Sequence, residues 1–129
     1  MPAKKRVVKP AKTLRNISWS VLSPASAAEY LDGARPTDVA FRTAATVEYE
    51  WSESECRIKS KVAMPAGTTN AEALRRIYAS LSRKVTKAEG GVEGSECFGK
   101  KRRDCISRHT LLDGVWHVSG STWELVTGS

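Results

Sequence analysis

Two cysteines and two histidines near the C-terminal end are the residues of this chain best suited to metal chemistry. Cys97, Cys105, His109 and His117 form a C-x7-C-x3-H-x7-H series, and thiolate plus imidazole is a ligand set that zinc accepts. Structural zinc sites, however, are usually announced by ligand pairs two to four residues apart, which this series lacks. The chain has three cysteines, an odd number that favours a reducing compartment. We therefore expect thiols without metal, with a zinc site and a Cys97–Cys105 disulfide as the alternatives.

Catalytic residues are harder to find. Glu48 and Glu50 would share one face of a strand and could act as an acid–base pair, but basic residues expected on the neighbouring strand favour ion pairing. None of the cysteines lies in a recognisable nucleophile motif, although Arg103 beside Cys105 could lower the pKa of that thiol. The glycines form neither G-x-G-x-x-G nor a P-loop. The sequence predicts a protein that is not an enzyme and has no cofactor, with a metal-dependent hydrolase as a minor alternative.

Positive charge is concentrated at the N-terminus. The chain carries a formal charge of +7, and its first 15 residues contain six bases and no acid. The remaining 15 bases nearly balance the 14 acids. Such an arm on an almost neutral body is typical of phosphate neutralisation, which gives affinity without sequence choice. An import signal and a solubilising tail are the alternatives. The arm bases are Lys4, Lys5, Arg6, Lys9, Lys12 and Arg15.

A second run of bases lies between Cys97 and Cys105. Four consecutive basic residues on a loop repel one another, and a bound polyanion would relieve that repulsion. A third group is expected on the polar face of a helix, where a solvated surface is the simpler interpretation. The candidate contacts are Lys100, Lys101, Arg102 and Arg103 in the loop, and Arg76 and Arg83 on the helix.

Alternation of apolar and polar residues predicts a hairpin in the middle of the chain. Residues 39–51 and 56–64 both follow a period of two. A four-residue loop between them would pair Trp51 with Cys56, Glu50 with Arg57 and Glu48 with Lys59, which joins opposite charges across the strands. Thr69 and Glu72 then have capping-box spacing, which predicts a helix from Asn70 to about Lys87.

The two ends of the chain predict further elements. Residues 14–22 alternate as a strand, and Pro24 to Asp32 is expected to form a short helix, N-capped by Ser23 and ended by Gly33. Residues 115–119 and 122–126 flank Gly120-Ser121 and predict a second hairpin. Its register would pair Trp116 with Leu125, Val118 with Trp123 and His117 with Glu124, which gives one wholly apolar face.

Together these elements predict an α+β fold in the order β-α-β-β-α-β-β. We expect an antiparallel sheet of about five strands with two helices packed on one face. Residues 1–13 would be a basic arm, disordered when free, and residues 14–129 a single domain. No apolar run is long enough to span a membrane.

The distribution of charge predicts a nucleic-acid-binding protein that contacts phosphates largely without regard to sequence. DNA and RNA, single- and double-stranded, are equally compatible with it. A homo-oligomer that packages a genome, like a viral or phage coat protein, is one form of this hypothesis. The alternative is a protein–protein adaptor that uses the aromatic terminal hairpin as its interface and the arm as a localisation signal. We expect a cytoplasmic location, or the nucleus or a virion for a eukaryotic or viral source.

Overall fold

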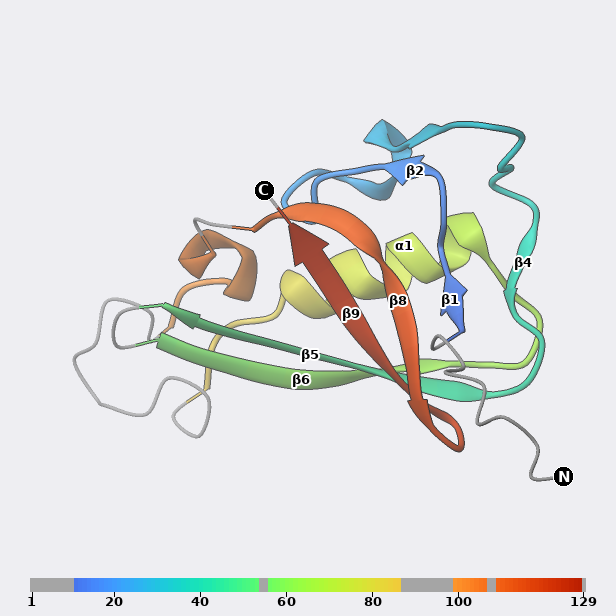
Figure 1. Cartoon of the computed structure of the whole chain (residues 1–129). Coiled ribbons are helices and arrows are strands. Elements are labelled where there is room, and N and C mark those ends of the chain that lie inside the picture. The colour runs from blue at the N-terminus through green and yellow to red at the C-terminus, as the bar shows by residue number, and fades with distance from the viewer. Residues whose placement is uncertain (1–10, 54–55, 87–98, 107–108, 129) are drawn as a thin grey trace, which may run out of the picture.

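The structure is a computed structural model that describes residues 11–53, 56–86, 99–106 and 109–128. Its largest element is a sheet of five strands (Figure 1). In spatial order the strands are β1 (Lys12–Thr13), β8 (Leu111–Ser119), β9 (Thr122–Gly128), β5 (Ala45–Glu53) and β6 (Cys56–Met64). The prediction of a mixed α+β fold with a five-stranded sheet is confirmed. The prediction of an antiparallel sheet is wrong at one place, because β5 and β9 run parallel.

The hairpin of β5 and β6 forms as predicted but in a different register. Trp51 pairs with Ile58, Glu50 with Lys59 and Glu48 with Lys61, so the predicted partners are shifted by two residues. Glu53 pairs with Cys56, and the connection is two residues long rather than four. A shift of two keeps every side chain on its predicted face. The expected strand over 39–51 is also interrupted: β4 (Val39–Phe41) leaves the sheet and pairs with β7 (Thr68–Thr69).

The terminal hairpin also forms, but its predicted register is wrong by one residue. Ser119 pairs with Thr122 across Gly120-Ser121, and Gly120 has φ +53°. The register then shifts between His117 and Ser119, so His117 pairs with Trp123 and Trp116 with Glu124. The extra residue of this bulge, Val118, is 55% exposed. A shift of one exchanges the two faces, so the wholly apolar face does not form.

The helix α1 (Asn70–Leu81) begins as predicted. Thr69 is the N-cap, and its side-chain oxygen accepts a hydrogen bond from the Glu72 N–H at 3.3 Å. The helix ends six residues before the predicted Lys87: the Arg83 N–H donates to the Ser80 carbonyl, three residues back, and the Val85 N–H donates to the Lys100 carbonyl instead of continuing the helix. Leu74, Ile77, Leu81 and Val85 from the predicted apolar stripe are buried.

The predicted helix over 24–32 is wrong. Only the 3₁₀ turn η1 (Ala25–Ala27) forms, and its N-cap is Pro24 rather than Ser23. The chain then extends as β3 (Glu29–Tyr30) and pairs with β2 (Ile17–Ser18). Of the strand predicted over 14–22, β2 and an isolated bridge between Ser20 and Leu111 form. A helix this short gains too few hydrogen bonds to offset its nucleation, whereas the extended chain gains ladder bonds. The fold therefore has one α-helix in its described part, not two.

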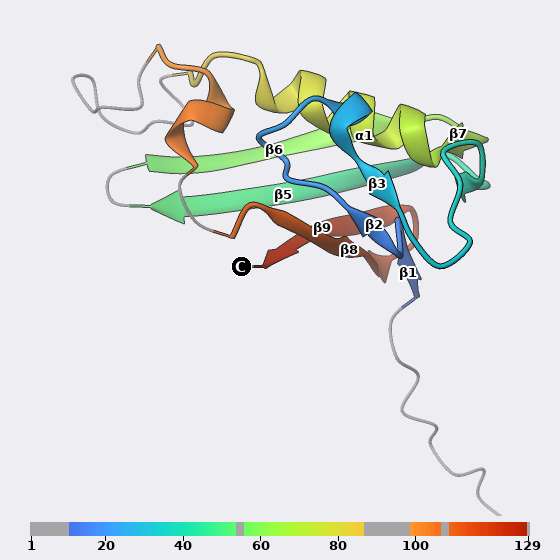
Figure 2. The same ribbon diagram turned by 90° about the horizontal axis from the view of Figure 1, so that it is seen from above.

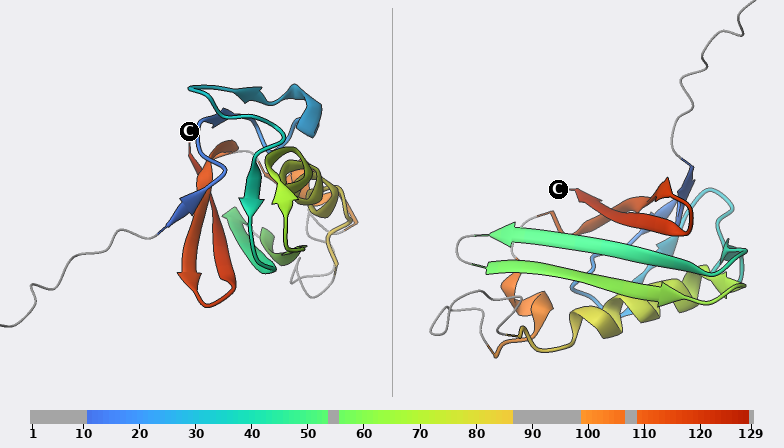
Figure 3. Two further views of the ribbon diagram at one scale, coloured as in Figure 1. Left: turned by 90° about the vertical axis from the view of Figure 1, so that its right-hand side faces the viewer. Right: turned by 90° about the horizontal axis from the view of Figure 1, so that it is seen from below.

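The core lies between the sheet and α1. Alternate residues of β5 and β6 face α1 and are buried, including Val47, Tyr49, Ile58 and Met64. Seen from above, α1 runs beside β6 while the β2–β3 ladder lies in front of the sheet (Figure 2). The end-on view in Figure 3 shows the strands of the C-terminal hairpin and α1 on opposite sides of β5 and β6. In the described part of the chain no helix is long and apolar enough to cross a membrane.

Candidate nucleic-acid interface

The bases predicted at the N-terminus fall into two groups. Lys4, Lys5, Arg6 and Lys9 lie outside the described residues. Arg15 is exposed, in the connection that follows β1. Lys12 is half-buried in β1, opposite Trp116 of β8.

The Lys12 side chain is engaged by the body of the protein. Its ammonium lies 3.6 Å from a carboxylate oxygen of Asp113 and 5.2 Å from the centre of the Trp116 ring. Gly114, with φ +154°, lets the lysine cross β8, because a Cβ at this position would overlap the Lys12 side chain. Both contacts attract the positive charge of the side chain. Lys12 therefore fixes the edge strand in place.

The four bases of the run 100–103 do not point the same way. Lys100 and Lys101 are exposed, whereas Arg102, the first residue of η2 (Arg102–Cys105), is only 5% exposed. The Arg102 guanidinium donates from Nη1 to the Tyr49 hydroxyl at 2.9 Å and to the Ser80 carbonyl at 3.0 Å. The expectation of four bases displayed together is therefore corrected, since Arg102 belongs to the core.

Arg103 packs on the outside of the same helix end. Its guanidinium carbon lies 5.0 Å from the centre of the Tyr78 ring, and Nη1 donates to the Tyr78 hydroxyl. The same nitrogen donates to the Ser82 hydroxyl at 3.0 Å. Both arginines thus approach the C-terminal turn of α1, where the helix dipole favours positive charge.

Pairing between two distant segments creates the exposed part of the site. The Arg102 N–H donates to the Arg83 carbonyl at 2.9 Å, and the Val85 N–H donates to the Lys100 carbonyl at 2.8 Å. These bonds place Lys84 and Lys101 opposite each other in an antiparallel bridge. Arg83, Lys84, Lys100 and Lys101 are all exposed, and we call these four residues the basic cluster.

Lys84 is the member of this cluster that the sequence did not identify. The sequence pattern predicts a helix that extends to Lys87 and contains Lys84, so the pairing of Lys84 with residue 101 has no signal in the local pattern.

Arg76, by contrast, is a predicted phosphate contact whose side chain is bound by other groups of the protein. Its Nε lies 3.1 Å from a carboxylate oxygen of Glu72, and Nη1 donates to the Ala63 carbonyl at 3.4 Å. Hydrogen bonding and charge from the arginines Arg75 and Arg76 lower the pKa of Glu72.

The structure does not bring the two predicted basic regions together. In the views of Figures 1 and 2, β1 and the orange turn η2 lie at opposite ends of the molecule. A ligand that contacts both the basic cluster and the chain near Lys12 must therefore extend across most of the protein.

The predicted cysteine–histidine series is only partly described, because Cys97 lies outside the described residues. The described part of the chain contains no group of three or more metal-binding side chains. Nε2 of His117 lies 2.8 Å from the Gly120 carbonyl oxygen, and the His117 ring packs against Trp123. Burial raises the pKa of the Cys105 thiol, opposite to the direction suggested by its basic neighbours.

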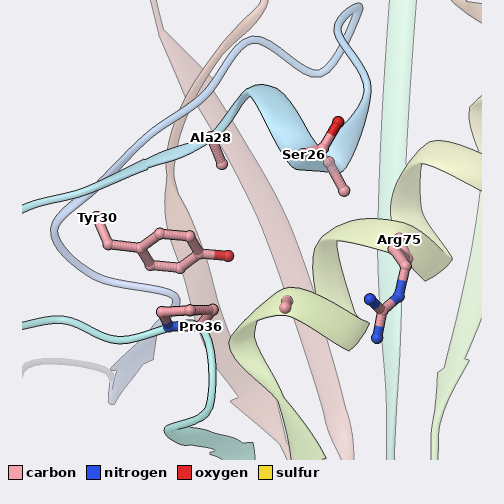
Figure 4. A pocket seen from close by; sticks show the side chains of 7 residues that line it. Ser26, Ala28, Tyr30, Pro36 and Arg75 are labelled. Carbon is pink, nitrogen blue, oxygen red and sulfur yellow. The ribbon is translucent and has the colours of Figure 1, made fainter.

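A shallow pocket lies between η1, β3 and the first turns of α1, with a volume of about 290 Å³ (Figure 4). Its walls are mostly small apolar side chains, and the Tyr30 ring and the Arg75 side chain border it. Burial raises the pKa of Tyr30. Arg75 already donates to a Glu72 carboxylate oxygen at 2.7 Å. The pocket therefore offers little polar chemistry beyond an engaged guanidinium and two hydroxyl groups.

Comparison with known proteins adds no assignment: the chain matches no family model, no curated protein and no solved structure. Function must therefore be argued from the geometry and charge of the chain itself.

Proposed function

We propose that this protein binds nucleic acid through phosphate contacts, using the basic cluster and the bases of the N-terminal arm, and that it is not an enzyme. The observation that carries the proposal is the position of Lys84 directly opposite Lys101, with Arg83 and Lys100 beside them. The arm bases Lys4, Lys5, Arg6 and Lys9 are included on the strength of the sequence alone.

Like charges directly opposite each other on paired strands destabilise a protein, because their Cβ atoms are only about 5 Å apart. The backbone bonds on either side of this bridge hold both segments in place, so the two lysine side chains start from neighbouring positions. A phosphate between them would turn repulsion into attraction, and its neutralisation would release counterions condensed on the nucleic acid. Anion binding is thus the use of this arrangement that fits its electrostatics.

A polymer fits better than a single small anion. The basic cluster and β1 lie at opposite ends of the molecule, and the arm precedes β1 in the sequence (Figure 1). Contacts that far apart can be satisfied together by the repeated charges of a nucleic-acid backbone. The cluster offers ammonium and guanidinium donors and no aromatic ring of its own, so we expect little discrimination between sequences.

The test is binding to fluorescent single- and double-stranded DNA and RNA over a series of salt concentrations. The full chain would be compared with the double substitution Lys84→Gln/Lys101→Gln and with a variant lacking residues 1–10, which leaves β1 intact. For double-stranded DNA, each lost phosphate contact should lower the log–log salt slope by about 0.9, so the double substitution should lower it by about 1.8.

Arg35→Gln/Arg42→Gln is the matched control. Both residues are exposed and outside the basic cluster, and the substitution removes the same charge. If this control weakens nucleic-acid binding as much as Lys84→Gln/Lys101→Gln does, the loss of affinity comes from the change in net charge, and the proposed site is wrong. Absence of binding to all four nucleic acids at low salt would refute the function itself.

The adaptor alternative rests on the terminal hairpin, and its rings are less accessible than the sequence suggested. Trp123 is half-buried, with its ring centre 5.5 Å from that of Phe41, and Trp116 lies under the Lys12 ammonium. Val118 is the exposed apolar side chain at the bulge of that hairpin.

Packaging of a genome by a homo-oligomer stays a prediction, and so does the location of the protein in the cell.

A further inference from the structure

Strand β6 forms one edge of the five-stranded sheet. Within the described part of the chain it pairs with β5 and with no other strand, over nine residues from Cys56 to Met64. The opposite edge is the two-residue strand β1, whose Lys12 side chain is engaged by Asp113. The long edge therefore has backbone groups for which the sheet supplies no partner.

Two hydrogen bonds show which residues of β6 direct their backbone groups away from β5. The Thr46 N–H donates to Ser121 at 2.8 Å, on the side of β5 away from β6, so Thr46 and its partner Ala63 form a non-hydrogen-bonded pair. Consistently, the Ala63 carbonyl accepts a bond from Arg76 of α1. Backbone direction alternates along a strand, so the N–H and C=O groups of Arg57, Lys59 and Lys61 also point outward.

The same three residues carry the exposed side chains of this edge. Arg57, Lys59 and Lys61 are exposed on the sheet face away from α1, while Ile58 and Val62 between them are buried on the other face. On the inner side of β6, Glu50 pairs with Lys59 and Glu48 lies 3.6 Å from Lys61. Charge therefore alternates from acidic on β5 to basic on β6, and no strand of the described residues pairs with β6 on its outer side.

From this edge we propose that β6 accepts an extended acidic segment of another protein as a sixth strand. The segment would lie about 4.8 Å from β6 and exchange backbone hydrogen bonds with Arg57, Lys59 and Lys61. Acidic residues at every second position would lie beside the three bases. The residues between them would face the side on which α1 packs, where apolar side chains are favoured. The partner is thus recognised by alternating acidic and apolar residues.

A second copy of β6 is a poor occupant of this edge. Antiparallel pairing of two such strands through the basic stretch sets arginine or lysine against lysine, which is unfavourable. A nucleic acid is also a poor occupant, because phosphate oxygens accept hydrogen bonds but cannot donate to the outward carbonyls. The acidic segment satisfies donors, acceptors and charges together.

The experiment uses the full chain and a short labelled peptide that alternates glutamate with valine and threonine. A peptide of the same composition with its glutamates adjacent is the control. Strand addition should slow hydrogen exchange at the amides of Arg57, Lys59 and Lys61, whereas the amides of Ser60 and Val62, which point toward β5, should be slow with or without the peptide. The control peptide should bind more weakly and should not change exchange at the three outward amides.

Two substitutions separate backbone pairing from charge. Lys59→Pro removes an outward N–H and leaves the β5–β6 ladder complete, so we expect affinity for the alternating peptide to fall about tenfold or more. Lys59→Gln keeps the N–H and removes the charge, and should weaken binding only about threefold. Circular dichroism and thermal unfolding establish that each variant folds. If Lys59→Pro does not fold, the exchange measurement on the unaltered chain decides alone.

Several outcomes would overturn this proposal. One is slow exchange at the three outward amides before any peptide is added, because the edge would then already be occupied. Another is peptide binding without a change in exchange. A third outcome is slower hydrogen exchange at these amides with oligothymidylate than with the peptide. This result would assign the edge to nucleic acid. The first two results do not bear on Lys84 and Lys101, so strand addition at β6 can fail while the proposed nucleic-acid contacts stand.

Discussion

The two halves of the basic run 100–103 have the same charge and opposite environments. Lys100 and Lys101 are exposed beside Arg83 and Lys84, whereas Arg102 and Arg103 turn toward α1. The arginines supply several donors in a fixed plane and reach hydroxyl and carbonyl oxygens at the end of the helix. The lysines have a single flexible charge that water can solvate. A run of like charges in a sequence can therefore contain structural and ligand-facing residues side by side.

The largest expected effect is on Arg102. Arg102→Ala leaves the Ser80 carbonyl and the Tyr49 hydroxyl without the guanidinium donor and opens a cavity beside the sheet. We expect the free energy of unfolding to fall by about 3 kcal/mol. Urea unfolding followed by circular dichroism measures this change. A loss below about 0.5 kcal/mol would mean that Arg102 is not a structural residue and would remove the contrast with Lys101.

A smaller effect is expected at Arg103, which is only half-buried. Arg103→Ala removes the contact with the Tyr78 ring and the bond to Ser82, and should cost about 1 kcal/mol of unfolding free energy. A double-mutant cycle with Tyr78→Leu should return a coupling energy of about 0.5–1 kcal/mol. Additive effects of the two substitutions would show that the ring and the guanidinium do not interact in solution.

The smallest effect on stability is expected at Lys101, with the opposite sign. Lys101→Gln removes one of two like charges that face each other across the bridge, so the free energy of unfolding should rise by about 0.3 kcal/mol. The gain should disappear at high salt, where the repulsion is screened. Unfolding curves at low and high salt measure it. A clear loss of stability would mean that Lys101 has a structural contact like that of Arg102.

The two hairpins show how far the sequence determines the fold. In both, the strands and the connecting residues follow from alternation and turn composition. For β5–β6 the predicted register differs by two residues, which leaves Glu48 and Glu50 facing bases of β6 as expected. For β8–β9 the bulge at Val118 moves the register by one and exchanges the faces. A bulge depends on what the bulged strand packs against, and a single sequence carries little signal for it.

The candidate site was predictable only in part. Charge alone predicts Lys100, Lys101 and Arg83 as contacts. The burial of Arg102 could not be predicted, because its partners Tyr49 and Ser80 are far away in the sequence. Lys84 was missed for a related reason: its neighbour is residue 101, and the helix that should have contained it ends at Leu81. Segments that pair across long stretches of chain leave no periodic pattern.

The position of β9 has a consequence for how the chain acquires its structure. Residues 122–128 form the middle strand of the sheet, between β8 and the much earlier β5. During synthesis, β5 and β6 emerge long before the strand that joins them to β8. Until then the hairpin offers open edges on both sides. The parallel contact of Val47 with Trp123 closes a long loop, and such distant contacts slow folding. Until β9 has been made, the growing chain can therefore associate with other chains through those unpaired edges.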